Sequence, residues 1–308
     1  MRALLANRLF WLCAVALLGA SLLPFWVSGY VLGLLTVAYF TGVYAMSWDL
    51  LFGFAGEVNF GPTFLIGLGA YTAGILDAQF SPALSVWWCV AGGTTAAVIG
   101  GVVLALPALR VSGPYFGLTT LVAVLILQNC VVVFASLTGG EIGLAVPDVI
   151  TVDPKLNYLM ALGFMILAGA ILFALSRSSV GLVLQASGQD AVQAAALGFN
   201  VTKHKLFAFT VSAFFSGLAG ALMVFYMGTA SVGTFIDIAI AVQIIIAAVL
   251  GGRRTVIGAA IGAMFLIVLA EVLRPLGDLA TLVVSIIALL VILFFPNGFL
   301  GMLGGARA

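Results

Sequence analysis

Long apolar runs separated by short polar segments make up almost the whole chain. A helix needs about 20 mostly apolar residues to cross the hydrocarbon core of a bilayer, and about ten runs reach that range. We predict spans near residues 9 to 28, 30 to 48, 60 to 77, 86 to 107, 114 to 135, 157 to 175, 206 to 227, 237 to 251, 256 to 273 and 279 to 295. The pattern therefore predicts an all-α, polytopic membrane helix bundle forming a single domain over residues 1–308.

The first run could also be a cleaved signal peptide, since Arg2 and Arg8 precede it. However, the run is long, and the following SLLPFWVSGY offers no small-residue cleavage site. We interpret it as a retained helix.

The composition agrees with a membrane protein. Of the 308 residues, 64% are hydrophobic and 7% charged, and the mean hydropathy is +1.31. These polar side chains are too few to cover the surface of a water-soluble globular protein. We therefore expect a lipid bilayer around the chain. The scattered basic residues indicate no nucleic acid partner. Cys13, Cys89 and Cys130 lie inside apolar runs without CxxC spacing, and we interpret them as small buried side chains.

The eleven basic residues predict the orientation of the bundle. If the N-terminus is cytoplasmic, ten crossings leave only Lys155 and Arg274 outside and the other nine basic residues inside. This distribution follows the positive-inside rule. We therefore predict a multi-pass protein with both termini, and a segment at about 178–204, in the cytoplasm.

Glycine recurs at spacings that allow helices to pack closely. Three pairs of this kind are Gly29 with Gly33, Gly217 with Gly220, and Gly258 with Gly262. The Gly-Gly pairs that begin at positions 139 and 251 lie at membrane boundaries beside polar residues, and we expect each to end a helix or to open its backbone.

Five polar side chains in or beside the runs are candidates for a substrate pathway: Glu57, Asn59, Gln128, Asn129 and Gln243. A charge at the bilayer centre costs about 2.5–3.5 kcal/mol, so Glu57 should face protein, water or the interface. Glu57 and Asn59 fit either an interfacial cap before the third span or a polar element of a pathway or interhelical hydrogen bond. The three amides are equally compatible with hydrogen bonds between helices and with a pathway lining.

The sequence contains no signature of an enzyme. The single histidine, His204, lies in the basic cluster KHK, which is typical of a membrane surface. GxSxG, HExxH, clustered metal ligands and the Rossmann glycine pattern are absent, so we expect no catalytic residues and no metal site. The ATP-binding P-loop is absent as well, and any coupling to ATP must come from a partner.

Residues 178 to 201, SSVGLVLQASGQDAVQAAALGFNV, form the longest stretch that does not suit lipid. The stretch favours helix, and the alternative is an amphipathic helix that lies on the lipid surface. Such a helix normally has large apolar residues and basic flanks along the same helix, whereas this one carries Ala194, Ala195 and Ala196. We therefore predict a segment that docks on a partner. The candidate docking residues are Gln189, Asp190, Ala194, Ala195, Leu197 and Gly198.

Several stretches resemble signatures of permease subunits of branched-chain amino acid ABC importers. GFAGEVNFGPTFLIGLGAYTAG is similar to the glycine-rich signature after the second span, and SLTGGEIGL to an outer-side element. Residues 178 to 222, which include FAFTVSAFFSGLAGAL, are similar to the cytoplasmic coupling loop and the helix after it. GGRRTVIGAAIGA and FFPNGFLG are similar to two further glycine signatures. The resemblance covers nearly the whole chain and favours the second of the two paired permeases.

The resemblance implies a type II-like ABC importer permease in the cytoplasmic (inner) membrane of a bacterium or archaeon. It implies four kinds of partner: a homologous second permease, two ATPase subunits, an extracytoplasmic substrate-binding protein and the bilayer. This chain would hold no cofactor, and ATP and Mg would bind to the ATPases. Their closure would push on the coupling loop and drive alternating access, so the candidate docking residues would contact an ATPase.

The chain departs from the family pattern at several positions. The coupling loop of the family usually carries a basic residue and several acids, whereas this chain has Gly188, Gln189 and Ala191 and only one charge, Asp190. In addition, Arg254 and Ala259 occupy positions where glycine and proline are common.

For the substrate, the resemblance favours branched-chain or other hydrophobic amino acids, with urea, short amides or aromatic acids as alternatives. An ion-coupled secondary transporter is the alternative of another class. It would need a paired acid at mid-depth, whereas Asp49, Glu57 and Glu271 fall near the ends of spans. A stand-alone channel would need no docking segment and would normally present a repeated selectivity element, which the sequence lacks.

Overall fold

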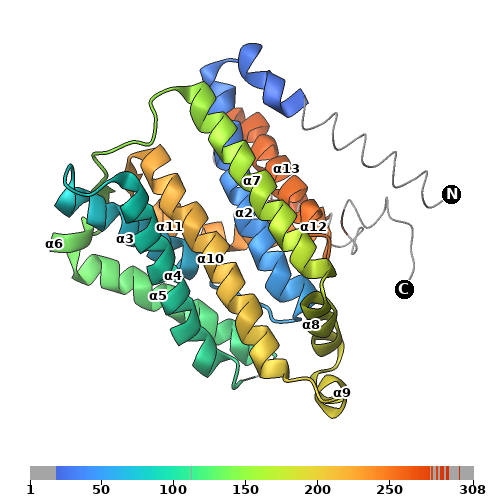
Figure 1. Ribbon diagram of the computed structural model, residues 1–308. Helices are drawn as coiled ribbons and strands as arrows, with labels where there is room; N and C mark the ends of the chain where they lie inside the picture. The colour runs from blue at the N-terminus through green and yellow to red at the C-terminus, as the bar shows by residue number, and fades with distance from the viewer. Residues whose placement is uncertain are drawn as a thin grey trace.

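The described part of the chain is a bundle of long helices (Figure 1). This computed structural model describes residues 19–111 and 113–277, together with a few positions between 279 and 298. About half of the predicted span 279 to 295, and half of the predicted span 9 to 28, lie outside the described residues.

The long helices are α2 (Gly29–Asp49), which continues as a π-helical turn η2 (Leu50–Phe54), α3 (Pro62–Phe80), α4 (Val86–Ala108), α5 (Pro114–Val133), α7 (Pro154–Arg177), α10 (Val201–Met227), α12 (Ile238–Gly251) and α13 (Ile257–Leu273). The shorter elements are η1 (Leu23–Phe25), α6 (Ala135–Thr138), β1 (Leu144–Ala145), α8 (Ser179–Gln189), α9 (Ala191–Ala196), β2 (Thr229–Ala230), α11 (Val232–Phe235) and η3 (Arg274–Leu276).

Seven helical stretches among the described residues are long and apolar enough to cross a membrane, by length and composition. They are α2 with η2, α4, α5, α7, α10, α11 with α12, and α13 with η3. Helix α3, 19 residues long, lies between several of these stretches. The seven stretches and α3 confirm the all-α membrane fold. Every predicted span from 30 to 273 coincides with one of these eight, and the predicted span 60 to 77 coincides with α3. The predicted total of about ten spans is not established by the described residues.

Proline and glycine set several helix ends. Pro62, Pro114 and Pro154 lie in the first turns of α3, α5 and α7, where the missing N–H costs no helical hydrogen bond. Gly139, with φ of 76°, follows α6, and α12 ends at Gly251. The predicted helix ends at both Gly-Gly pairs are confirmed.

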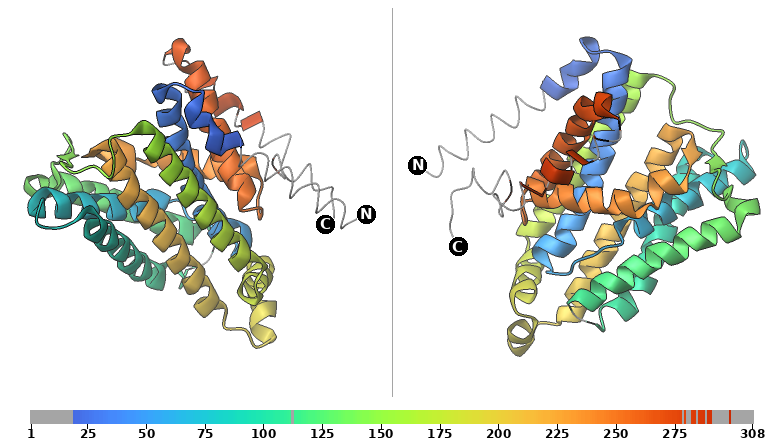
Figure 2. Two further views of the ribbon diagram at one scale, coloured as in Figure 1. Left: turned by 45° about the horizontal axis from the view of Figure 1, so that its top comes forward. Right: turned by 180° about the vertical axis from the view of Figure 1, so that it is seen from behind.

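The helices form two packed groups. The first contains α3, α4 and α10, and the second contains α2, α7, α12 and α13. Helix α10 packs against α2 and so joins the two groups, while α5 lies along α3 and α4. In the view from behind, α5 and α12 run across the same side of the bundle (Figure 2).

Glycines allow close backbone approach within these groups. A Cβ on Gly69 of α3 would collide with the carbonyl of Gly217 on α10. Gly258 and Gly262 of α13 approach α12 equally closely, so two of the three predicted glycine pairs pack as expected. Gly29 has no neighbouring atom within 4 Å, so the expectation for that residue was wrong.

The two ends of the bundle carry different structures. Helices α8 and α9 project from one end, which we name the α9 end (Figure 1). At the opposite end of α10, β1 and β2 form a short antiparallel pair with Leu144 opposite Ala230, and we name this the β end.

Candidate functional site

The predicted coupling segment is helical, as its sequence indicated, and it forms two short helices. Ser178 and Asp190 begin α8 and α9, and each side chain caps its helix. The Asp190 Oδ1 atom accepts hydrogen bonds from the N–H groups of Val192 (2.9 Å) and Gln193 (3.0 Å). The only charged residue of α8 and α9 is thus used as a helix cap, which stabilises the start of α9 through both hydrogen bonding and the helix dipole.

Helix α9 offers an exposed surface that is mostly apolar. Val192 is 80% exposed and Leu197 is 74% exposed, and Ala195 lies between them on the same exposed segment. Ala194 is buried and faces inward. We name the exposed side chains of Val192, Ala195 and Leu197 the α9 face.

The remaining predicted docking residues flank this surface. Gln189 is exposed at the end of α8. Gly198 is exposed after α9 with φ of 88°, a left-handed conformation that glycine adopts without strain. The role of these residues in docking stays a prediction.

Helix α8 rests directly on the segment that follows η2. A Cβ on Gly188 would lie 2.6 Å from the carbonyl oxygen of Phe54, and Gly56 opposite it has φ of 74°. A larger residue at Gly188 would push the two backbones apart. This contact gives a physical reason for Gly188 in a loop where the family usually carries charged residues.

A turn at residues 252–256 closes over the same segment. The carboxylate of Asp49, which is 1% exposed, accepts hydrogen bonds from the N–H groups of Arg254 (3.1 Å) and Val256 (3.0 Å). The Nε atom of Arg254 donates to the carbonyl of Gly53 at 2.8 Å. Arg254 and Val256 have φ of 64° and 51°, so their backbones are held in a conformation that glycine would adopt more easily. Asp49 therefore supports a strained turn.

Arg253 lies over the aromatic ring of Phe52, with its guanidinium carbon 4.4 Å from the ring centroid. Burial lowers the pKa of Arg253, and the charge of Arg254 lowers it further, while the carboxylate of Asp49 opposes both effects. The cation on the ring is a second link between the 252–256 turn and η2.

Glu57 forms an ion pair with Lys205 near the start of α10. The Nζ atom of Lys205 lies 2.5 Å from Oε1 of Glu57, and the two side chains are 14% and 12% exposed. The carboxylate is thus neutralised at the α9 end of the bundle, and it does not cap α3, whose first residue follows Gly61. Sequence reasoning missed this pair because the two residues are 148 positions apart.

Breaking this pair is expected to destabilise the connection between α10 and the turn before α3. Glu57→Gln and Lys205→Met should each lower the free energy of unfolding, whereas the double variant should lose less than the sum. We expect a coupling energy of roughly 1–3 kcal/mol, measured by thermal unfolding of the four proteins in detergent. Purely additive effects would contradict the pairing.

Asn59 is part of a buried turn. Its side-chain oxygen accepts a hydrogen bond from the N–H of Gly61 at 2.8 Å, and its carbonyl accepts one from Nε1 of Trp48 at 2.6 Å. These bonds hold the chain between η2 and α3. The described contacts of Asn59 are therefore those of a residue that shapes the backbone.

The two predicted polar residues of α5 lie away from the packed centre. Asn129 is exposed, and its Nδ2 atom donates back to the carbonyl of Leu125 at 2.7 Å; Gln128 is half-buried. Asn129 and the exposed Cys130 line a groove of about 310 Å³.

The expectation of a buried thiol was wrong for Cys130 and is confirmed for Cys89, while Cys13 lies outside the described residues.

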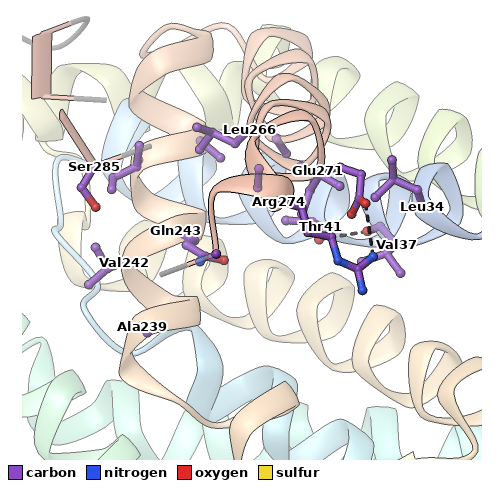
Figure 3. Close-up of a pocket in the computed structure, with 16 residues that line it drawn as sticks. Leu34, Val37, Thr41, Ala239, Val242, Gln243, Leu266, Glu271, Arg274 and Ser285 are labelled. Atoms are coloured by element: carbon purple, nitrogen blue, oxygen red, sulfur yellow. Dashed lines mark hydrogen bonds and ion pairs between the residues drawn. The ribbon is translucent and has the colours of Figure 1, made fainter. Parts of the chain in front are cut away.

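Gln243 lines a different pocket, of about 670 Å³, between α2, α12 and α13 (Figure 3). The pocket is largely apolar, with Gln243 and Thr41 on its wall. A polar cluster lies beside them: Nη1 of Arg274 is 3.2 Å from the carboxylate of Glu271 and 2.6 Å from the hydroxyl of Tyr30.

The five predicted pathway residues therefore lie in three places. Glu57 and Asn59 are at the α9 end, Gln128 and Asn129 are on α5, and Gln243 is on α12. What the structure brings together instead, at the α9 end, are η2, α8, the start of α10 and the 252–256 turn. Helix α8 contacts η2, α7 and α10, and α9 contacts α8 and α10.

Comparison with known proteins shows the family of the chain. The family described as "Branched-chain amino acid transport system / permease component" matches residues 30–296. The high-affinity branched-chain amino acid transport system permease proteins LivM of Salmonella typhimurium (strain LT2) and Escherichia coli (strain K12) are each 26% identical to this chain, over 91% of it and 72% of the relative. No solved structure matches the chain. The chain belongs to the family of permease components of branched-chain amino acid transport systems.

Proposed function

We propose that this permease is one of two membrane subunits of an ATP-driven importer that moves branched-chain or other hydrophobic amino acids by alternating access. It pairs with a homologous permease in the cytoplasmic membrane of a bacterium or archaeon, with both termini in the cytoplasm. Two ATPase subunits hold ATP and Mg, and an extracytoplasmic binding protein delivers the substrate.

The observation that carries this proposal is the α9 face. A helix that projects beyond the bundle with Val192 and Leu197 largely exposed has a surface suited to another protein. Small side chains such as Ala195 allow a close approach, and the only charge, Asp190, is already used as a cap. Docking therefore rests on shape and apolar contact more than on salt bridges.

The contacts of α8 supply the route for coupling. Movement of α9 by an ATPase displaces α8, whose Gly188 lies on the backbone after η2. The Glu57–Lys205 pair and the Asp49-supported turn connect the same region to α10, α3 and α13. A tilt of α8 is thus passed to helices of both packed groups.

The exposed amides support a pathway shared with a second permease. Asn129 on α5 and Gln243 on α12 are exposed in this chain, and the two helices run across the same side of the bundle (Figure 2). An amide that faces hydrocarbon is costly, whereas one that faces a partner or a polar pathway finds hydrogen bonds. A second permease covering this side would enclose both.

Uptake by the reconstituted complex tests the proposal. We consider proteoliposomes in which the ATPases of the complex face the lumen and the binding protein is outside. They are expected to accumulate radiolabelled leucine in the lumen when the lumen contains ATP. A proton or sodium gradient without ATP should give no uptake. Gradient-driven uptake without ATP would instead favour an ion-coupled secondary transporter. The ligand retained by the purified binding protein separates amino acids from urea, short amides and aromatic acids.

A further inference from the structure

Helix α3 carries an unusual set of buried polar atoms. Among the described residues, three buried side-chain atoms have no hydrogen-bond partner: Thr63 Oγ1, Tyr71 OH and Asp77 Oδ1. All three belong to α3. Buried polar groups are nearly always hydrogen-bonded, so three unpartnered ones on one helix require an explanation.

The three groups share one side of the helix. At about 100° per residue, Thr63, Tyr71 and Asp77 fall within an arc of about 120°. Gly67 and Gly74 lie inside the same arc, between the polar residues. From Thr63 to Asp77 the helix rises by about 21 Å, which is most of the hydrocarbon thickness. We name this side of α3 the α3 track.

The α3 track is covered by protein. A Cβ on Gly67 would lie 2.6 Å from Ile236, between α11 and α12, and 3.2 Å from Leu127 of α5. Near the β end, a Cβ on Gly74 would lie 3.2 Å from Val146. The cover therefore consists of α5, the α11–α12 junction and the segment that follows β1. Leu127 is two residues from Asn129, so the track lies beneath the helix that bears this exposed amide.

Other buried hydroxyls of the bundle find partners. The hydroxyl of Thr120 donates to the Gly117 carbonyl at 2.8 Å and accepts from the N–H of Phe60 at 3.0 Å. The hydroxyls of Tyr39 and Tyr158 lie 2.7 Å apart. Among the described residues, buried side-chain polar atoms without a hydrogen-bond partner thus occur on α3 alone, and burial of a hydroxyl in this bundle does not by itself leave it unpaired.

We infer that the α3 track is a wall of the substrate pathway, closed in this conformation by α5 and the α11–α12 junction. This inference rests on the proposed function. When the cover moves away, the hydroxyls of Thr63 and Tyr71 and the free oxygen of Asp77 hydrogen-bond to a zwitterionic α-amino acid. Hydroxyls donate to its carboxylate and accept from its ammonium group, and the carboxylate oxygen of Asp77 accepts from the ammonium group. Gly67 and Gly74 leave room for the apolar side chain.

Removal of the two hydroxyls tests the inference in the assembled complex. Thr63→Val and Tyr71→Phe keep the shapes and delete the unpartnered groups. We expect their thermal stability in detergent to stay at or above the wild-type value, because no hydrogen bond is lost. Uptake of radiolabelled leucine per folded complex should fall by roughly fivefold for each hydroxyl, the factor that one hydrogen bond represents.

Thr120→Val and Tyr158→Phe are the matched controls, since their hydroxyls are hydrogen-bonded in the structure. They should lower thermal stability and leave leucine uptake per folded complex unchanged. Unchanged uptake in Thr63→Val and Tyr71→Phe, at any stability, would overturn the inference and indicate that the two hydroxyls hold structural water.

Accessibility gives a second measurement that does not depend on leucine as the substrate. In a variant without Cys13, Cys89 and Cys130, Tyr71→Cys should react with a membrane-impermeant thiol reagent during ATP hydrolysis and stay unreactive at rest. No reaction during turnover would overturn the inference. If the wild-type complex hydrolyses ATP but does not transport leucine, only the proposed substrate fails, and the labelling still decides whether the α3 track opens.

Discussion

Replacing Ala195 with glutamate is expected to abolish substrate-stimulated ATP hydrolysis and ATP-driven uptake. Ala195 lies on the α9 face, and in the proposed function its small side chain allows close contact with a groove of an ATPase. A carboxylate at this position must either lose its water on docking or hold the surfaces apart. Loss of a central contact of this kind costs about 2 kcal/mol or more, which weakens docking at least roughly thirtyfold.

The fold should tolerate this substitution, because Ala195 is exposed. Val152→Glu is the matched control: Val152 is 85% exposed in the loop before α7, far from α9. Membrane insertion and elution on gel filtration should be normal for both variants. ATPase subunits should co-purify with Val152→Glu and be lost from Ala195→Glu. Wild-type uptake by Ala195→Glu would show that α9 does not couple the ATPases to the bundle.

Asp49→Ala is expected to produce the largest loss of stability. The substitution leaves the part-buried N–H of Arg254 and the buried N–H of Val256 without their acceptor, in a turn whose backbone is already strained. An unpaired buried donor costs about 1–3 kcal/mol and a part-buried one costs less, so we expect the free energy of unfolding to fall by roughly 2–4 kcal/mol. Thermal unfolding in detergent measures the effect.

Asp237→Ala provides the comparison for Asp49. Asp237 also accepts a backbone hydrogen bond, from Ala239 at 2.8 Å, but at an exposed helix start. Loss of such a cap costs about 1 kcal/mol. If Asp49→Ala and Asp237→Ala destabilise equally, the 252–256 turn does not depend on the buried carboxylate as described.

The positions of the helices could be predicted because a membrane leaves the backbone few choices. A run of apolar residues in lipid must satisfy its own N–H and C=O groups, so the apolar run from 86 to 107 becomes the helix Val86–Ala108. The same logic predicted that residues 178–201 lie outside the membrane-spanning helices, since this stretch does not suit lipid. Hydropathy did not reveal that this segment divides at Asp190 into two capped helices.

The partners of individual polar residues could not be predicted, because they come from distant parts of the chain. Nothing near Glu57 in the sequence indicates Lys205, and nothing near Asp49 indicates the 252–256 turn. Helical periodicity also fails to separate a face that meets lipid from one that meets a partner. Asn129 therefore became a pathway candidate without any sign that it faces away from its own bundle.

The buried hydroxyls of α3 were missed for a related reason. Threonine and tyrosine are common in membrane helices, so the residue types at positions 63 and 71 alone do not indicate a binding role. Their significance comes from the absence of a partner within the described residues, which only the packing of α5 and the α11–α12 junction reveals. Regular spacing on one side of a helix, with glycines between polar residues, is a signal that the sequence does contain.

The proposal that α9 docks on an ATPase is tested most directly by identifying the protein that contacts α9. A photo-crosslinking residue in place of Val192, in the complex within native membranes, is expected to form a light-dependent adduct with a P-loop ATPase subunit. The same residue in place of Val152 should form no such adduct. If the Val192 position gives adducts with lipid alone while the complex still transports its substrate, α9 is not the docking helix and the coupling route described above is wrong.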